Sequence, residues 1–184
     1  MPRRQRRLPD VWLVSDERND AVLDAALKRL PRGSGLIFRH YHLPDPVRRA
    51  RFDQLARLAR ARGHIVVLAG DARTARRWGA DGSYGAGVEG TGLRLASAHS
   101  ARELAKAGRA DAVLLSPVFA TRSHPGIRTL GPLRWRLLAR LAPMPVIALG
   151  GMTARRARAA GIARWAAIDG LGSSQRLAGI PGDS

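Results

Sequence analysis

Short apolar runs alternate with helical patterns along almost the whole chain, and this alternation restricts the fold more than any other feature. We expect strands at eight runs: Val11–Ser15, Leu36–Arg39, Ile65–Ala69, Gly82–Tyr84, Leu93–Ala96, Ala112–Ser116, Val146–Leu149 and Trp165–Ile168. Helical patterns lie between most of them, at 19–30, 45–62, 71–79, 100–107, 130–141 and 153–160. Most of these runs are apolar throughout, as parallel strands covered on both faces are. The order predicts an α/β fold, a single-domain (β/α)8 TIM barrel, with an open doubly wound sheet as the alternative.

The helix boundaries carry their own signals. Asp45, Ser100 and Thr153 are expected N-caps, because their side chains can accept from the first free N–H groups of a helix. Glycine follows four of the expected helices, as it does at helix C-termini, at Gly63, Gly79, Gly108 and Gly161. At 184 residues the chain is small for this fold, and the link at 85–92 and the last helix at 171–178 are expected to be short. We expect a basic tail at 1–10, the barrel at 11–178 and a second tail at 179–184.

Composition excludes several classes of site. The chain has no cysteine, so it has neither a thiol nucleophile nor a thiolate metal site. Its five histidines do not show the spacing of zinc ligands. No apolar run reaches the roughly 20 residues of a membrane helix, and no long apolar segment follows the basic N-terminus. These features predict a cytoplasmic protein that does not bind membranes.

The net charge of +18 comes from basic residues that are arginine at all but two positions, Lys28 and Lys106. Such a field attracts polyanions, so binding of nucleic acid is one interpretation. The other is solvated helix faces, because at 45–62 arginine alternates with apolar residues at helical period. Aromatic residues are 5% of the chain and do not alternate with arginine as stacking platforms would. Small phosphorylated molecules are therefore the preferred partners, and nucleic acid stays an alternative.

Two strand ends carry residues suited to an anion. In a parallel β/α protein, ligands bind at the carboxyl ends of the strands. Pro117 should end one strand, and Thr121 and Ser123 follow it with hydroxyl groups. After the next strand, Gly150 and Gly151 allow the backbone to approach a ligand closely. The two ends together predict a phosphate pocket on one face of the barrel.

Four motifs resemble a known family when taken in order. They are Trp12–Asp16, Ala96–Ser100, Ser116–Thr121 and Leu149–Thr153. On these motifs the chain resembles the thiamine phosphate synthase/TenI family of small (β/α)8 barrels, over residues 11–171. The resemblance implies a transferase of thiamine biosynthesis. Such an enzyme joins hydroxymethylpyrimidine pyrophosphate to thiazole phosphate and releases pyrophosphate, through a pyrimidine cation and with Mg²⁺.

The resemblance also implies roles for individual residues. Arg39 and Ser97 would neutralise the leaving diphosphate, and His124 would join them as the third catalytic residue. A second set would bind substrate or its phosphate: Tyr41, His99, Thr121, Ser123, Gly150 and Gly151. Asp71 and Glu89 would bind Mg²⁺. For three of these the sequence also allows a purely structural role, namely an ion pair of Arg39 with Asp16, a helix cap at Ser97 and a structural hydrogen bond at His99.

The chain departs from the family pattern mainly where the diphosphate and metal would bind. Residues of other types replace glutamine, lysine, an asparagine–aspartate pair and a second lysine, at Ile37, Tyr41, Ala69–Gly70 and His124. Asp169 stands where the family has serine and would repel phosphate, and Pro117 stands where TenI proteins have their acid/base histidine. Besides an active synthase, the sequence therefore allows a catalytically weakened or TenI-like relative that binds a phosphorylated thiazole or pyrimidine. The number of subunits is open, with a homo-oligomer as one alternative.

Overall fold

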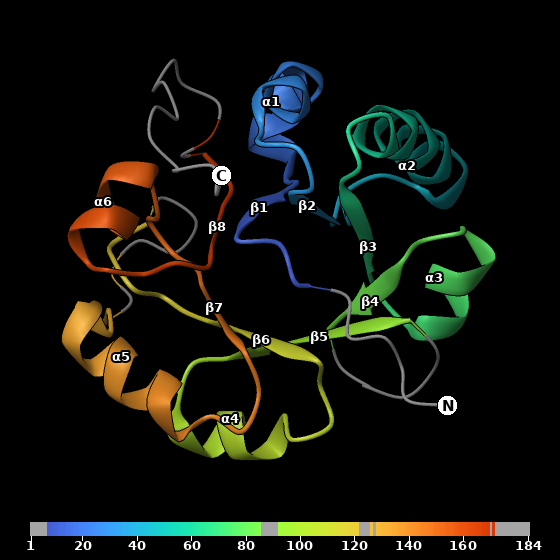
Figure 1. Cartoon of the computed structure of the whole chain (residues 1–184). Helices are drawn as coiled ribbons and strands as arrows, with labels where there is room; N and C mark the ends of the chain where they lie inside the picture. The colour runs from blue at the N-terminus through green and yellow to red at the C-terminus, as the bar shows by residue number, and fades with distance from the viewer. Residues whose placement is uncertain (1–6, 86–91, 122–125, 127, 170, 172–184) are drawn as a thin grey trace.

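Eight parallel strands pair in chain order and close into a barrel (Figure 1). The computed structural model describes residues 7–85, 92–121, 126, 128–169 and 171. The strands are β1 (Val11–Val14), β2 (Gly35–Phe38), β3 (Ile65–Ala69), β4 (Gly82–Tyr84), β5 (Leu93–Ala98), β6 (Ala112–Leu115), β7 (Val146–Ala148) and β8 (Trp165–Ala167). The predicted TIM barrel is confirmed, and the open doubly wound sheet is excluded because β1 also pairs with β8.

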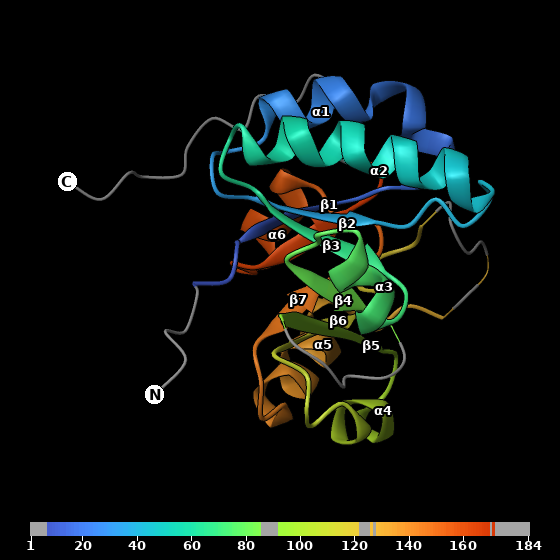
Figure 2. The same ribbon diagram turned by 90° about the vertical axis from the view of Figure 1, so that its right-hand side faces the viewer.

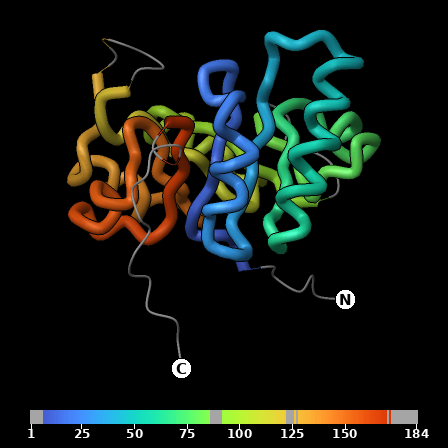
Figure 3. Tube along the Cα trace, turned by 90° about the horizontal axis from the view of Figure 1, so that it is seen from above, coloured from blue at the N-terminus to red at the C-terminus, as the bar shows by residue number. Residues whose placement is uncertain are grey.

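Helices cover the outside of the barrel, and α1 and α2 lie side by side there (Figures 2 and 3). The helices are η1 (Glu17–Val22), α1 (Leu23–Arg29), α2 (Asp45–Arg60), α3 (Ala72–Arg77), α4 (Ala101–Lys106), α5 (Gly131–Leu141) and α6 (Ala154–Ala159). None of the helices in the described ranges is long and apolar enough to cross a membrane. The expected last helix at 171–178 and most of the link at 85–92 lie outside the described residues.

The helix ends follow local chemistry, with two corrections. Ser100 and Thr153 are N-caps as predicted. The prediction that Asp45 is an N-cap is wrong, because Pro44 is the N-cap of α2 and Asp45 is its first residue. The pattern at 19–30 is divided into a 3-10 turn and α1, because Asp16 and Asn19 form a capping box that starts the chain turning earlier. Gly63, Gly79 and Gly161 adopt positive φ after their helices, whereas Gly108 does not.

The core has two layers, as alternate strand residues face inward and outward. The barrel interior is filled by one group of side chains: Trp12, Val14, Ile37, Val67, Leu95, Ala112, Leu114, Ile147 and Ala166. Trp12 packs flat against β2, where a Cβ on Gly35 would lie 2.1 Å from its ring. A second, larger layer packs between strands and helices and includes Leu13, Phe38 and Leu68. This filled interior leaves the ends of the strands as the place for a site.

Asn19 ties the barrel together at the carboxyl ends of its first and last strands. Its buried side chain donates to the carbonyl oxygens of Val14, at 3.0 Å, and Ile168, at 2.9 Å. Its own Oδ1 accepts from the backbone N–H of Asp16 at 2.8 Å. Since strand pairing does not extend to Ile168, the amide of Asn19 holds the two strand ends together where the pocket opens.

Candidate functional site

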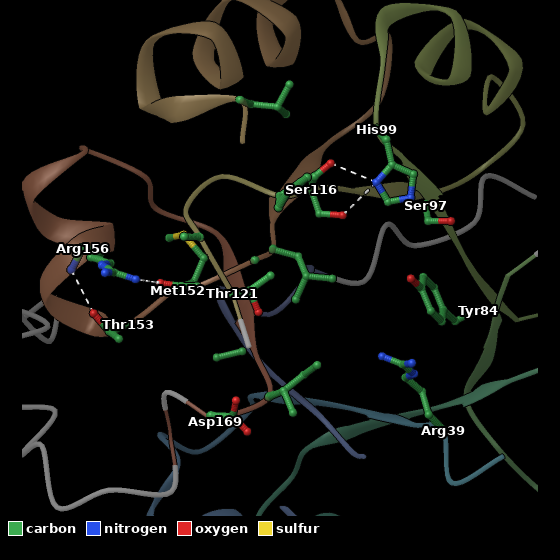
Figure 4. A pocket seen from close by; sticks show the side chains of 18 of the residues that line it. Arg39, Tyr84, Ser97, His99, Ser116, Thr121, Met152, Thr153, Arg156 and Asp169 are labelled. Atoms are coloured by element: carbon green, nitrogen blue, oxygen red, sulfur yellow. Dashed lines mark hydrogen bonds between the residues drawn. The ribbon is translucent and has the colours of Figure 1, made fainter. Parts of the chain in front are cut away.

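A pocket of about 890 Å³ opens at the carboxyl ends of the strands (Figure 4). Its walls come from β2, β4 and β5 on one side and from the segments after β6, β7 and β8 on the other. Seven residues predicted from the sequence line it: Arg39, Tyr41, Ser97, His99, Thr121, Gly150 and Gly151. The structure therefore brings together side chains from parts of the chain that are far apart in sequence.

The segments after β6 and β7 touch each other at Gly150 and Gly151. Both glycines have positive φ, of 96° and 60°. A Cβ on Gly150 would lie 2.7 Å from the Cα of Pro117, and one on Gly151 would lie 2.4 Å from the carbonyl oxygen of Ala120. Side chains are thus excluded at both positions by conformation and by space. This close approach places Thr121 and Gly151 on the same pocket.

Arginine side chains accompany the two glycines. The guanidinium of Arg156 donates to the carbonyl of Gly151 at 2.5 Å and lies over the ring of Phe119, with its Cζ 5.0 Å from the ring centroid. Thr153 accepts from the backbone N–H of Arg156 and so caps α6. Arg128 also lines the pocket. Neither arginine was predicted from the sequence, where the position of Arg156 just after a cap next to two glycines was the only signal.

The opposite end of the pocket is formed by Arg39, Tyr84 and Ser97 (Figure 4). Burial raises the pKa of the Tyr84 phenol, and the nearby charge of Arg39 and a hydrogen bond with Ser97 oppose that rise only in part. The phenol is therefore protonated at neutral pH and can donate a hydrogen bond. The structural role considered for Ser97 is wrong, because Ser100 caps α4. Tyr84 was not predicted from the sequence, because a tyrosine at the end of a short strand is usually interpreted as a core residue.

Arg39 lies near one carboxylate. Its Nη2 is 3.9 Å from Oδ2 of Asp16, while Oδ1 of Asp16 is 2.8 Å from Nε of Arg18. Burial would raise the pKa of Asp16, but the hydrogen bonds from Arg18 outweigh it, so that pKa is lowered. The ion pair of Arg39 with Asp16 is thus present but long, and the guanidinium also faces the pocket.

His99 combines a structural hydrogen bond with a place in the pocket. Its Nδ1 lies 3.0 Å from the carbonyl oxygen of Ser116, which can only accept, so Nδ1 carries the proton. The Oγ of Ser116 lies 3.2 Å from the same nitrogen. In the neutral ring Nε2 is therefore the unprotonated nitrogen. His99 presents a hydrogen-bond acceptor in a pocket whose other polar groups are mostly donors.

The described residues form no cluster of carboxylates that would hold a Mg²⁺ ion without substrate. The carboxylate of Asp71 accepts from the N–H of Thr74 at 2.8 Å, caps α3 and is not part of the pocket wall. Within the described ranges there is no group of three or more histidine, aspartate or glutamate side chains that could hold a metal ion. Asp169 does line the pocket, but its Oδ2 is 3.9 Å from Nη1 of Arg18. Glu89 lies outside the described residues, as do Ser123 and His124.

Two residues at family positions take different places. Ile37 is fully buried in the barrel interior, below the pocket. Tyr41 lines the pocket with a largely exposed ring, and its centroid lies 5.9 Å from the guanidinium of Arg39 and 5.2 Å from that of Arg48. The first position therefore offers no polar group to the pocket, and the second offers an aromatic ring held among cations.

The fold and the pocket define a (β/α)8 barrel protein with an arginine-bearing pocket at the carboxyl ends of its strands. Residues 95–171 match the family model of thiamine monophosphate synthase, a segment that runs from β5 past the end of β8. The resemblance inferred from the sequence motifs is thereby confirmed, and it covers the part of the barrel that carries Gly150 and Gly151. A search of curated protein sequences gives no significant match.

Solved structures show the same fold at low sequence identity. Thiamine phosphate pyrophosphorylase from Pyrococcus furiosus is 21% identical, with a TM-score of 0.74 over 90% of this chain and 88% of that one. The thiamine phosphate pyrophosphorylase from Bacteroides thetaiotaomicron is 15% identical, with a TM-score of 0.59 over 86% and 82%. The YdjI aldolase from Escherichia coli K12 is 11% identical, with a TM-score of 0.59 over 87% and 75%. The fold is therefore shared with enzymes of different chemistry, and the site must carry the argument for function.

Proposed function

We propose that the chain is a thiamine phosphate synthase-type transferase, which joins hydroxymethylpyrimidine pyrophosphate to thiazole phosphate. The observation that carries the proposal is a single pocket with an arginine at each end: Arg39 beside Tyr84 and Ser97, and Arg156 beside Gly151 (Figure 4). A reaction between two phosphorylated molecules needs two anion subsites with the reacting atoms between them. The match of β5 to β8 to the thiamine monophosphate synthase family supports the same conclusion.

The proposed reaction is a substitution at the methylene carbon of the pyrimidine. The bond between that carbon and the diphosphate oxygen breaks, and the diphosphate leaves with the electron pair. The thiazole nitrogen then supplies the electrons of the new carbon–nitrogen bond, so nothing is oxidised or reduced. Donors that bind the leaving group more tightly as its charge grows accelerate such a step.

Each end of the pocket has residues for one part of this reaction. Arg39 provides a cation for the departing diphosphate, while Ser97 and the protonated phenol of Tyr84 provide hydroxyl groups. At the other end, Gly150 and Gly151 line the pocket, and their lack of side chains lets the segment after β6 close against them, beside the cation of Arg156. Thr121 adds a hydroxyl group there. Ser123, His124 and Glu89 stay predictions of the sequence, whereas Asp71 caps α3 outside the pocket wall. Mg²⁺ would supply further neutralisation of the diphosphate, and no step here depends on it.

One observation favours a second candidate, a relative that binds a phosphorylated thiazole or pyrimidine without efficient turnover. Within the described ranges, the end of β3 offers Ala69 and Gly70, and Asp71 is used as a helix cap. The end of β3 thus adds no side chain to the diphosphate end of the pocket. Loss of a single transition-state donor commonly costs about 10²–10³ in rate.

The two candidates are separated by measuring binding and turnover on the same protein. Isothermal titration with thiazole phosphate gives the affinity, and an assay with both substrates and Mg²⁺ gives thiamine phosphate formation. We expect Arg156→Gln to weaken binding about tenfold, because a charge-assisted hydrogen bond is lost. Arg155→Gln is the matched control, since Arg155 is exposed on the same helix and does not line the pocket. Binding without product contradicts the synthase, and binding that is equal in both variants contradicts the site.

A further inference from the structure

The backbone of Arg39 is held by side chains on both of its polar groups. The strand pairing of β2 with β3 ends at Phe38, one residue earlier. The N–H of Arg39 donates to Oγ of Ser15 at 2.8 Å, and its carbonyl oxygen accepts from Nε of Arg48 at 2.9 Å. Since the side chain of Arg39 faces the pocket, these two contacts fix the point from which its guanidinium extends.

Ser15 belongs to a longer hydrogen-bond chain. Its Oγ lies 2.8 Å from Nδ1 of His40, and Nε2 of His40 lies 2.9 Å from Oδ1 of Asp20. A carboxylate only accepts, so Nε2 carries the proton and Nδ1 accepts from the hydroxyl of Ser15. The lone pairs of Ser15 are then available to the N–H of Arg39. Every donor in the chain has an acceptor, and the direction of each bond is fixed by Asp20.

The chain is rigid because it is buried and tightly packed. Ser15 and the side chain of His40 have no exposed surface, and the His40 ring stacks on Phe38 with 4.7 Å between centroids. His40 has a φ of 41°, which costs a residue with a side chain of order 1–3 kcal/mol and persists only where its surroundings hold it. Asp20 is itself held by Nε of Arg51 at 2.8 Å. Conformations of this kind gather at ligand sites.

A serine, a histidine and an aspartate in hydrogen-bond contact also suggest a nucleophile, but the geometry excludes that role. Ser15 is completely buried and is not part of the pocket wall. Its oxygen is occupied by the N–H of Arg39 and by His40. The one member of this network that faces the pocket is Arg39. The chain therefore acts through the arginine.

We propose that Asp20, His40 and Ser15 are positioning residues that hold Arg39 in place for the phosphoryl groups bound at its end of the pocket. The inference rests on the proposed function in one respect only, the use of Arg39 to bind a diphosphate. It assigns a role to a part of the first half of the barrel that contacts no substrate. The family match at 95–171 does not include these residues.

A double-mutant cycle with inorganic pyrophosphate as the probe tests this role. Isothermal titration compares the unchanged protein with Ser15→Ala, Arg39→Gln and the double variant. We expect Arg39→Gln to weaken pyrophosphate binding about tenfold and Ser15→Ala about fivefold. In the double variant, Ser15→Ala should add less than about twofold, because contacting groups that act together are not additive. A loss from Ser15→Ala that is equally large without Arg39, or no loss at all, overturns the proposal.

A second pair of variants guards against a general effect on folding. Asp20→Ala removes the acceptor of His40, whereas Asp24→Ala removes the other carboxylate on Arg51, at 2.8 Å, without touching His40. We expect weaker pyrophosphate binding from Asp20→Ala only, and equal losses from both overturn the proposal. Product formation is judged separately. If pyrophosphate binding depends on both Arg39 and Ser15 but no thiamine phosphate forms, the positioning role stands and the synthase is contradicted. If thiamine phosphate forms at the same rate after Ser15→Ala, the synthase stands and the positioning role is contradicted.

Discussion

Replacing Gly151 by alanine tests the close approach on which the phosphate end of the pocket depends. A Cβ at this position would lie 2.4 Å from the carbonyl oxygen of Ala120 and 3.0 Å from Cβ of Phe119. The first of these atoms is backbone, so it can give way only if the segment after β6 moves. Gly63 is a matched control, because it has a φ of 73° and nothing within 4 Å of an added Cβ.

The magnitude follows from two separate costs. A left-handed conformation costs an alanine about 1–2 kcal/mol, and this part is shared by Gly151→Ala and Gly63→Ala. Forcing an extra carbon into packed surroundings costs a further 1–3 kcal/mol or so, and only Gly151→Ala bears that cost. Reduced freedom of the unfolded chain returns about 0.4–1 kcal/mol in both variants. We therefore expect Gly151→Ala to lower the free energy of unfolding by about 1–3 kcal/mol more than Gly63→Ala.

Urea denaturation followed by circular dichroism measures both free energies, and titration with inorganic phosphate measures the site. Because the backbone of Ala120 must move, we also expect phosphate binding to weaken in Gly151→Ala and to be unchanged in Gly63→Ala. Equal destabilisation by the two substitutions would show that the segments after β6 and β7 do not touch. The assignment of Thr121 and Gly151 to one pocket would then be wrong.

Three further predictions concern stability and the second anion subsite. Burial lowers the pKa of His40 and His64 below the usual 6.5, so the fold keeps both neutral while the unfolded chain takes up protons. The free energy of unfolding should thus be highest above about pH 7 and fall towards pH 5, by up to about 1.4 kcal/mol per pH unit for each histidine. Midpoints of urea denaturation that do not change with pH contradict this. Asn19→Ala should lower the free energy of unfolding by about 2 kcal/mol, because it leaves two strand-end carbonyls without their donor, and a loss below about 0.5 kcal/mol in urea denaturation refutes the tie between β1 and β8. Tyr84→Phe should weaken pyrophosphate binding about threefold to tenfold in titration and leave the phosphate end unaffected, and unchanged affinity removes Tyr84 from the site.

The fold was predictable because its signal is repeated along the chain. Most strands are apolar runs because both faces of the sheet are covered, so alternation was not needed to find them. The helix boundaries were harder where two signals compete. The Asp16–Asn19 capping box starts a 3-10 turn before α1, and Pro44 takes the cap position that Asp45 was expected to hold.

The site was predictable in part, for a physical reason. Gly150 and Gly151 have no role in a helix or strand, so their presence after an apolar run pointed to close backbone contact. Tyr84 and Arg156 gave no such signal, because whether a strand-end or helix-start side chain faces the pocket depends on barrel register and on packing across it. The chain from Asp20 to Arg39 was equally hidden, since its members contact one another only after β1 and β2 have paired.

The two ends of the pocket are built in different ways. At the phosphate end the key contacts are backbone atoms kept close by Gly150 and Gly151, and that end lies within the segment that matches the family. At the other end, Arg48 of α2 donates to the carbonyls of Arg39 and Ala69, at 2.9 and 2.7 Å. Arg48 therefore ties the ends of β2 and β3 together beside Arg39, whereas the other end depends on the close approach of the segments after β6 and β7.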